Sequence, residues 1–187
     1  MPVEIEMRAR FSQEVHERLV ARLERDGDDL GHDDKYIYFY VLPDQLLKVT
    51  DNITTDTGKI TLKGGKIGQG AAFPETEIPI GRDDIAAAVR IFNALGFEST
   101  MHEAYNARRN FRFGGVEIAV KWSEAWGYHA EFEVLLDDEP SPAEVMAAHE
   151  RIAAVARELD VILMSESELA EFTAAFESAR QNSDAES

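Results

Sequence analysis

Residues 3–11 read Val-Glu-Ile-Glu-Met-Arg-Ala-Arg-Phe, so that apolar and charged residues alternate over the whole stretch. Apolar side chains occupy the odd-numbered positions and charged side chains the even-numbered ones. Because successive side chains of a β-strand point to opposite faces, this period of two predicts a strand with one buried face. The other face carries two carboxylates, Glu4 and Glu6, followed by the cations Arg8 and Arg10.

The overall charge limits which partners such a face can have. The chain has 36 Asp and Glu residues against 19 Lys and Arg residues, which gives a formal charge of −17. A surface of this sign repels nucleic acid and anionic membranes, because both need a basic patch. We therefore expect no nucleic acid and no membrane as partners, and an anion can bind only where the few cations are gathered together.

The composition also bears on domain organisation and location. The chain of 187 residues contains no cysteine, which excludes disulfides, thiolate metal sites and cysteine nucleophiles. No apolar run approaches the ~18 residues of a membrane span, and early acids argue against a secretory signal. We expect a cytoplasmic protein with a single domain over residues 1–180 and a disordered acidic tail over residues 181–187.

Alternation and turn residues recur along the chain. Strands are expected over residues 35–42, 45–50, 59–63 and 75–80, and three antiparallel strands over about residues 101–136, with a turn at Gly114-Gly115. Capping residues and helical periodicity predict helices between Ser12 and Gly27, over about residues 85–95, from Ser141 to about residue 158, and over about residues 166–179. This order of elements indicates an α+β fold built on an antiparallel sheet.

Ionised residues fill nearly every position on the polar side of these strands. The acids are Glu4, Glu6, Glu75, Glu77, Glu117, Glu131 and Glu133. The cations are Arg8, Arg10, Lys48, Lys59, Lys63, Arg108, Arg112 and Lys121. A plain solvated face is the simplest alternative, because antiparallel sheets often alternate apolar and polar residues. However, a solvated face normally mixes Ser, Thr, Asn and Gln with its charges.

The pattern Glu-x-Glu occurs three times, at positions 4/6, 75/77 and 131/133. Neighbouring carboxylates on one face repel each other unless a cation lies between them. A small cluster of hard oxygen ligands suits Mg²⁺ or Mn²⁺, and both ions bridge to phosphates. Lys and Arg on the remaining strands would bind the phosphate oxygens, arginine in a bidentate way. Together these residue types predict a polyphosphate site.

The order of these motifs resembles that of the CYTH family, the triphosphate tunnel metalloenzymes. Glu4-x-Glu6-x-Arg8 resembles the family's Glu-x-Glu-x-Lys signature, and Glu75-x-Glu77 its central acidic pair. Residues 46–49 and 60–63 are similar to its Leu-Arg-Ile-Arg and Leu-Thr-Leu-Lys strands. Arg108-x-x-Phe111, residues 126–133 and residues 165–169 resemble its later elements, so that the likeness spans roughly residues 3–170 in the right order.

The resemblance implies an antiparallel, eight-stranded, tunnel-like β-barrel with helices packed outside and charged faces turned into the lumen. Family members bind a triphosphate there with Mg²⁺ or Mn²⁺ and hydrolyse it, or cyclise ATP in the class IV adenylyl cyclases. The metal ligands would be Glu4, Glu6, Glu131 and Glu133. The phosphate contacts would be Arg8, Arg10, Lys48, Lys63, Arg108, Arg112 and Lys121. Catalysis would rest on Glu4, Glu6, Arg8 and Lys63, and the resemblance suggests a homodimer.

Four positions depart from the family pattern. Arg8 stands where the family has lysine, Thr50 and Asn106 replace two phosphate-binding cations, and Lys121 falls where an aspartate is usual. We expect a metal-dependent hydrolase of inorganic tripolyphosphate or a small organic triphosphate. A class IV adenylyl cyclase and a non-catalytic triphosphate- or nucleotide-binding protein are the alternatives. The lost cations favour the binder, whereas the retained Glu-x-Glu pairs at both ends favour the enzyme.

Two smaller questions concern single strands. Tyr36, Tyr38 and Tyr40 alternate with apolar residues, which leaves open which of the two rows faces inward. Core packing is favoured for the tyrosines. His129 has the polar parity of the strand that carries Glu131 and Glu133, and it is a minor candidate for the site.

Overall fold

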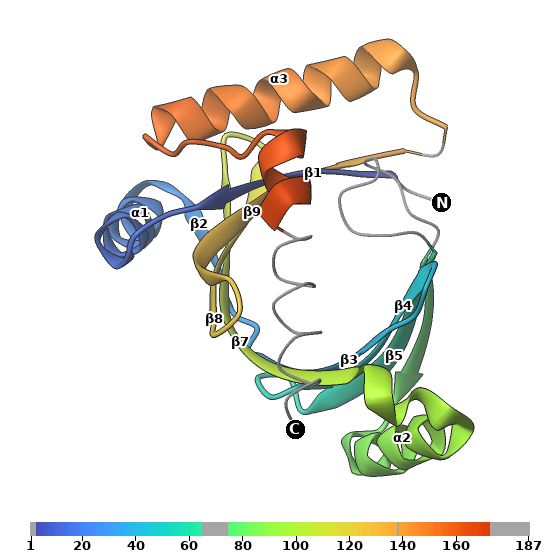
Figure 1. The fold of residues 1–187 in the computed structure, drawn as a ribbon. Helices are drawn as coiled ribbons and strands as arrows, with labels where there is room; N and C mark the ends of the chain where they lie inside the picture. Colours follow the sequence, from blue (N-terminus) through green and yellow to red (C-terminus); the bar gives the residue numbers. More distant parts are fainter. Residues whose placement is uncertain (1–2, 65–74, 138, 173–187) are drawn as a thin grey trace.

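The computed structural model describes residues 3–64, 75–137 and 139–172, in which nine strands form one antiparallel sheet. The strands are β1 (Val3–Arg10), β2 (Asp28–His32), β3 (Lys35–Val41), β4 (Gln45–Asn52), β5 (Thr57–Gly64), β6 (Glu75–Ile80), β7 (Met101–Phe113), β8 (Val116–Ser123) and β9 (Gly127–Leu136). Eight of them are hydrogen-bonded in the order β1-β9-β8-β7-β3-β4-β5-β6, and β2 pairs with β7 beside this path. Figure 1 shows the sheet curving round a central space.

This architecture confirms the expected α+β fold with an antiparallel, eight-stranded, tunnel-like sheet. The ninth strand, β2, is not anticipated from its sequence, Asp-Asp-Leu-Gly-His, which shows no alternation. The path ends at β1 and β6, and no pairing joins these two strands in the part of the chain that the structure describes. The curvature therefore comes from the twist of the paired strands.

Three helices cover the convex side of the sheet. The first, α1 (Gln13–Asp26), starts at Ser12, whose hydroxyl accepts the backbone N–H of Val15, and ends at Gly27. The second, α2 (Ile85–Phe92), runs into a wider turn over Asn93–Phe97 in which Gly96 has a φ of 92°. The third, α3 (Pro142–Glu158), opens with the expected capping box between Ser141 and Glu144. Of the last expected helix, the described part is helical over residues 166–172.

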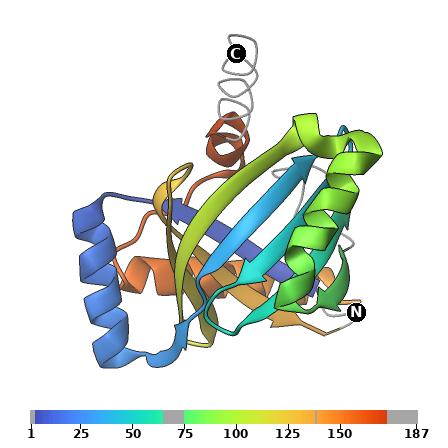
Figure 2. The ribbon, with the colours of Figure 1, turned by 90° about the horizontal axis from the view of Figure 1, so that it is seen from below.

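The helices bury the apolar rows of the strands in two clusters. In the first, Ile5 and Phe132 lie among side chains of α1 and α3. In the second, Tyr40, Leu47 and Val49 pack against α2. In Figure 2, α1 (blue) lies at the left and α2 (green) at the right, with β3 and β7 between them. Because the apolar rows of β1, β4, β5, β8 and β9 pack on the helix-covered side, the charged rows of these strands turn to the concave side.

The turn between β7 and β8 offers a test of this packing. Gly114 and Gly115 both have positive φ, but a Cβ on Gly114 would lie 2.7 Å from Cγ2 of Val155, whereas a Cβ on Gly115 would meet nothing closer than 3.8 Å. We expect Gly114→Ala to lower the free energy of unfolding by ~2–4 kcal/mol and Gly115→Ala by ~1–2 kcal/mol. Urea unfolding of both variants measures the difference. Equal losses of unfolding free energy in the two variants would show that Val155 of α3 does not pack closely against Gly114.

None of the helices in the described residues combines the length and the apolar character that a membrane span needs. The tail expected over residues 181–187 and the second half of the last helix lie outside the described residues. The side chain of Glu75 lies outside them as well, although the backbone of this residue pairs with Lys63.

Candidate functional site

The register of β1, β9, β8 and β7 aligns ionised residues across the concave face. One cross-strand row runs from Glu6 through Glu133 to Glu117. The next row places Arg8 directly opposite Glu131. Directly opposed residues of an antiparallel pair have their side chains on the same face, about 4.5–5.5 Å apart at Cβ. The concave face therefore holds a row of carboxylates beside a row that contains a cation.

Three of the carboxylates share one electrostatic environment. Burial, followed by the charge of Glu131, raises the pKa of Glu6 to about 7. Burial and the charge of Glu133 raise the pKa of Glu4, and burial and the charge of Glu6 raise the pKa of Glu133. Mutual repulsion inside a partly buried cluster disfavours full ionisation. Glu4, Glu6 and Glu133, named here the carboxylate cluster, therefore carry more negative charge than their surroundings balance, although Arg8 contacts Glu6.

Glu131 is in a different state, because two cations already contact it. Its carboxylate forms an ion pair with the Nζ of Lys121, and its Oε1 lies 3.4 Å from Nη2 of Arg8. Arg8 also donates from Nε to Glu6. Burial alone would raise the pKa of Glu131, but Lys121 and Arg8 hold it well below its usual range. Glu131 is therefore ionised and compensated by the protein itself.

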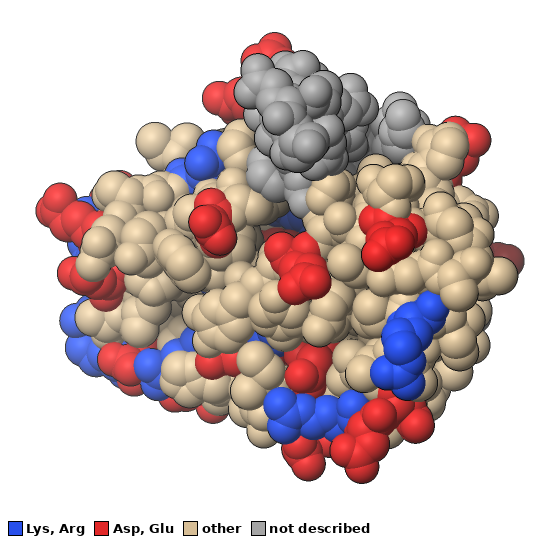
Figure 3. Space-filling model, turned by 60° about the horizontal axis from the view of Figure 1, so that its bottom comes forward, with Lys and Arg blue, Asp and Glu red and all other residues tan. Residues whose placement is uncertain are grey.

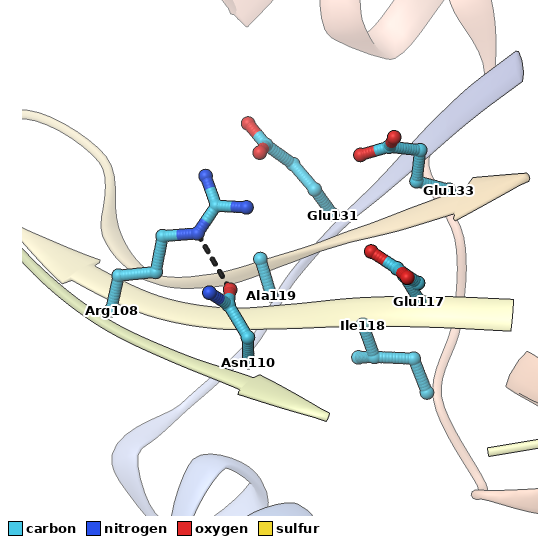
Figure 4. Close-up of a pocket in the computed structure, with 7 residues that line it drawn as sticks. All are labelled: Arg108, Asn110, Glu117, Ile118, Ala119, Glu131 and Glu133. Atoms are coloured by element: carbon cyan, nitrogen blue, oxygen red, sulfur yellow. Dashed lines mark hydrogen bonds between the residues drawn. The ribbon is translucent and has the colours of Figure 1, made fainter. Parts of the chain in front are cut away.

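A small hollow with a cavity volume of about 10 Å³ opens beside these groups, lined by residues of β7, β8 and β9. Ala119 lies directly opposite both Glu131 and Asn110, and its short side chain leaves this space unfilled. In Figure 4 the carboxylates of Glu117 and Glu133 lie near each other on one side of the hollow, and the guanidinium of Arg108 lies on the other side. The hollow is thus negative on one side and positive on the other.

The strands β4 and β5 form the opposite wall and contribute lysines. Lys48 and Lys63 lie on the concave face. The residues that alternate with Lys48 on β4, Leu47 and Val49, pack against α2 on the convex side. The charge of Lys63 lowers the pKa of Glu4 on β1, which places these two residues close enough to interact across the tunnel. Lys59 forms an ion pair with Glu77 on β6.

Thr50 and Asn106 stand where the CYTH pattern has cations, and each lies opposite a lysine on the neighbouring strand. Thr50 pairs directly with Lys59, and Asn106 pairs directly with Lys35. The Nζ of Lys35 lies 2.6 Å from Oδ2 of Asp33. Burial, together with the charges of Arg108 and Lys59, lowers the pKa of Lys35 although Asp33 opposes this. Lys35 is a concave-face cation that the sequence pattern does not indicate.

The inward row of β3 is the one that contains Lys35, Ile37 and Phe39, since Phe39 pairs directly with Lys48. The tyrosines face the convex side. The hydroxyl of Tyr40 donates to Oδ1 of Asn93 at 3.1 Å, and its ring packs edge-on against Phe92. Tyr40 is therefore a core residue, which agrees with the prediction that the tyrosines of this strand pack in the core.

Aromatic side chains hold the remaining cations at one mouth of the tunnel. The guanidinium of Arg8 lies 5.4 Å from the ring centroid of Trp126, and that of Arg10 lies 3.9 Å from the ring centroid of Phe172. Arg10 also donates from Nε to the carbonyl oxygen of Trp126 at 3.1 Å. Such contacts fix the direction of a guanidinium. Arg112, by contrast, forms an ion pair with Glu117 and is half exposed.

His129 lies on the concave face, directly opposite Lys121 and Arg10. It is 5% exposed, and its Nδ1 is 2.9 Å from the carbonyl oxygen of Gly127. Burial and the ammonium of Lys121 lower the pKa of His129 to about 4. The imidazole is therefore neutral near pH 7, and the contact with Gly127 requires that its Nδ1 carries the proton.

The donor types of the carboxylate cluster fit a hard divalent cation, but the side chains do not form a ready-made cage. No group of three or more His, Asp or Glu side chains is close enough to hold a metal ion in the residues that the structure describes. Glu4, Glu6 and Glu133 offer oxygen ligands with raised pKa values, which a divalent cation would relieve. Glu131 does not share this property, because Lys121 and Arg8 neutralise it.

The exterior contrasts with this concentration of charge. On the described part of the face shown in Figure 3, Lys and Arg side chains lie interspersed with Asp and Glu, and no broad basic patch forms. Arg82, for example, contacts both Asp51 and Asp56. On this face the cations are therefore dispersed among acids.

The chain was compared with known proteins and structures. No protein-family model matches it, and no curated protein matches it in sequence. A conserved hypothetical protein from Pyrococcus furiosus has 22% identity and a TM-score of 0.66, with 89% of this chain and 94% of that chain covered. A provisionally assigned adenylate cyclase from Vibrio parahaemolyticus has 16% identity and a TM-score of 0.64, with coverages of 92% and 98%.

A third similar structure is a provisionally assigned adenylyl cyclase from Hippeastrum, described as having a dominant triphosphatase activity. Its identity is 17% and its TM-score 0.60, with 94% of this chain and 96% of that chain covered. Likeness at such identities establishes a shared fold over nearly the whole chain. The fold implied by the CYTH resemblance is therefore confirmed.

Proposed function

We propose that this chain is a divergent member of the CYTH family and a metal-dependent hydrolase of a triphosphate bound inside the tunnel. The observation that supports the proposal most strongly is the division of the concave face. Glu133 and Glu117 lie on one side of a small hollow and Arg108 lies on the other, while Lys48 and Lys63 come from β4 and β5 of the same concave face. Solvent exposure alone does not explain why cations gather on the concave face of a protein with a formal charge of −17.

The cations suit a chain of phosphates rather than a single one. Lys48 and Lys63 come from β4 and β5, Arg108 from β7 and Lys35 from β3. These strands line successive parts of one curved wall, so that an extended anion can contact several of them. Arg108 would bind non-bridging oxygens in a bidentate way, and the lysines would act as point charges.

A divalent cation is part of this proposal. Glu4, Glu6 and Glu133 would hold it, and when bound it would act as a Lewis acid on a phosphoryl oxygen. A carboxylate oxygen of the cluster that does not bind the ion would orient the attacking water and accept its proton. Arg108 and the tunnel lysines would stabilise the charge that develops on the non-bridging oxygens.

The proposal is tested by assaying the purified protein with tripolyphosphate, ATP and thiamine triphosphate in the presence of Mg²⁺ or Mn²⁺. We expect release of phosphate that depends on the metal and is lost with a chelator. Cyclic AMP should be followed in the same reactions. Its formation from ATP, with pyrophosphate as the second product, would replace hydrolysis by the cyclase alternative.

The compensated state of Glu131 favours one other function, a non-catalytic triphosphate-binding protein. Arg8 and Lys121 are both engaged by Glu131, which leaves fewer cations for a transition state. If this alternative holds, tripolyphosphate will raise the melting temperature in a saturable way, but none of the three compounds will be turned over. That result would contradict the hydrolase.

A further inference from the structure

Lys121 is an enclosed cation of the concave face. It lies on β8, between Arg108 on β7 and His129 on β9 in the same cross-strand row. Only 12% of its side chain is exposed, and its Nζ contacts Glu131, of which 19% is exposed. A buried ammonium is costly unless a carboxylate pairs with it. The position of Lys121 is therefore tied to Glu131 and not to solvent.

The same contact changes what Glu131 can do. A carboxylate binds a divalent cation by offering uncompensated negative charge. Glu131 has one oxygen on Lys121 and the other 3.4 Å from Arg8. To bind a metal, it would have to release a buried ammonium, which would then lie unpaired beside the incoming ion. Coulomb repulsion between this ammonium and the incoming ion would oppose binding there.

The other carboxylates face the opposite situation. Glu133 lies directly between Glu6 and Glu117 in its cross-strand row, so that three acids are adjacent on three strands. Of these, Glu117 has Arg112 as a partner and Glu6 has Arg8. Among the described residues, no ion pair is found for Glu133. Attraction for an added cation is therefore strongest on the Glu133 side of the hollow.

We propose that the ammonium of Lys121 permanently occupies the cation position next to Glu131, so that the tunnel takes up a single divalent cation, on the side of Glu133. In this arrangement Glu131 is a positioning residue for Lys121 and Arg8 and is not a metal ligand. The inference rests on the proposed function only in assuming that a divalent cation enters the tunnel. It differs from the expectation drawn from the sequence that Glu131 is one of four metal ligands.

Titration with Mn²⁺ alone tests this inference, with the free ion followed by its electron paramagnetic resonance signal. We expect the wild-type protein to bind one Mn²⁺ per chain. The double variant Lys121→Met/Glu131→Leu replaces the buried ion pair by apolar groups of similar size, which proteins tolerate well. It should still bind one Mn²⁺, with a Kd within about threefold of wild type.

The single variant Lys121→Met should behave differently, because it leaves Glu131 without its ammonium. We expect either a second bound Mn²⁺ or an affinity raised by about tenfold or more. Lys59→Met is the matched control, since it removes a concave-face lysine that pairs with Glu77 instead. It reports the general effect of removing one positive charge, and its affinity should rise by less than that of Lys121→Met.

Several results would overturn the inference. These are two Mn²⁺ or none bound by the wild type, loss of Mn²⁺ binding in the double variant, or equal changes in Lys121→Met and Lys59→Met. If Lys121→Met does not fold, the wild type and the double variant still decide the question. Because the readout is bound metal, a protein that hydrolyses no triphosphate can still confirm or contradict the role of Lys121.

Discussion

Glu133→Gln is expected to lower kcat/KM for tripolyphosphate by roughly 10²- to 10³-fold, the loss seen when one preorganised electrostatic group is removed from an active site. Glu133 lies between Glu6 and Glu117 and faces the hollow opposite Arg108. Glutamine has the same shape but no charge, so the demand of the cluster for a divalent cation falls. Steady-state kinetics with Mn²⁺ varied from limiting to saturating concentrations measures the effect.

The melting temperature separates this loss from a failure to fold. Neutralising Glu133 removes a charge that repels Glu6, so the variant should be at least as stable as the wild type without metal. Glu24→Gln is the matched control, because Glu24 lies on α1 and contacts Arg109 on the convex side. It should keep wild-type kinetics. Full activity in Glu133→Gln would place the catalytic carboxylates elsewhere.

Local sequence patterns predict most of the sheet. Strict alternation over residues 3–11 gives β1, and the capping residues Ser12 and Ser141 give the starts of two helices. These signals are local: they depend on side chains a few positions apart. The prediction misses β2, because Asp28–His32 has no period of its own. It forms a strand because the second half of β7, around Asn110, offers it free backbone groups that β3 does not reach.

Alternation separates two faces of a strand but does not say which one points inward. On β1 the choice is clear, because one row is apolar and the other is ionised. On β3 both rows are largely apolar, and the lysine at position 35 stands at the end of one of them. Only the packing of Tyr40 against Phe92 on α2 decides the direction. Lys35 is missed for this reason, although its strand is predicted.

Pairings between strands distant in sequence decide the chemistry of the site. The Glu-x-Glu pattern indicates a cluster of carboxylates, but it treats Glu131 and Glu133 alike. They differ because Glu131 forms an ion pair with Lys121, which lies diagonally across from it on β8. Glu133 lies directly opposite another acid, Glu117. That distinction depends on the register of β8 and β9. Sequence alone can therefore propose the members of the site but cannot divide them into compensated and uncompensated carboxylates.

Glu6→Gln is expected to make the metal-free protein more stable above pH 7 and to leave its stability unchanged near pH 4.5. The pKa of Glu6 is raised to about 7 from its ordinary value of 4.5. Between these two values the folded chain holds a proton that the unfolded chain has lost, so the free energy of unfolding falls as the pH rises. Glutamine does not titrate and escapes this loss, which amounts to ~3 kcal/mol at full ionisation.

Comparing the two proteins isolates Glu6 from other titrating groups. The pKa of His129 is lowered to about 4, so its own contribution to the free energy of unfolding rises with pH over the same range. It would mask Glu6 in the wild type, but it cancels in the difference between wild type and variant. Urea unfolding with a chelator at several pH values between about 4.5 and 8 gives that difference.

Adding Mn²⁺ near pH 8 should reverse the order of stability. A ligand that binds only the folded state stabilises it by mass action, and the wild type keeps the carboxylate that the ion needs. Arg8 limits the size of the pH effect, because it donates to Glu6 and also contacts Glu131. If Glu6→Gln is instead less stable near pH 8 without metal, the ion pair with Arg8 outweighs the repulsion. The carboxylate cluster would then lack the unbalanced negative charge on which the proposed metal site depends.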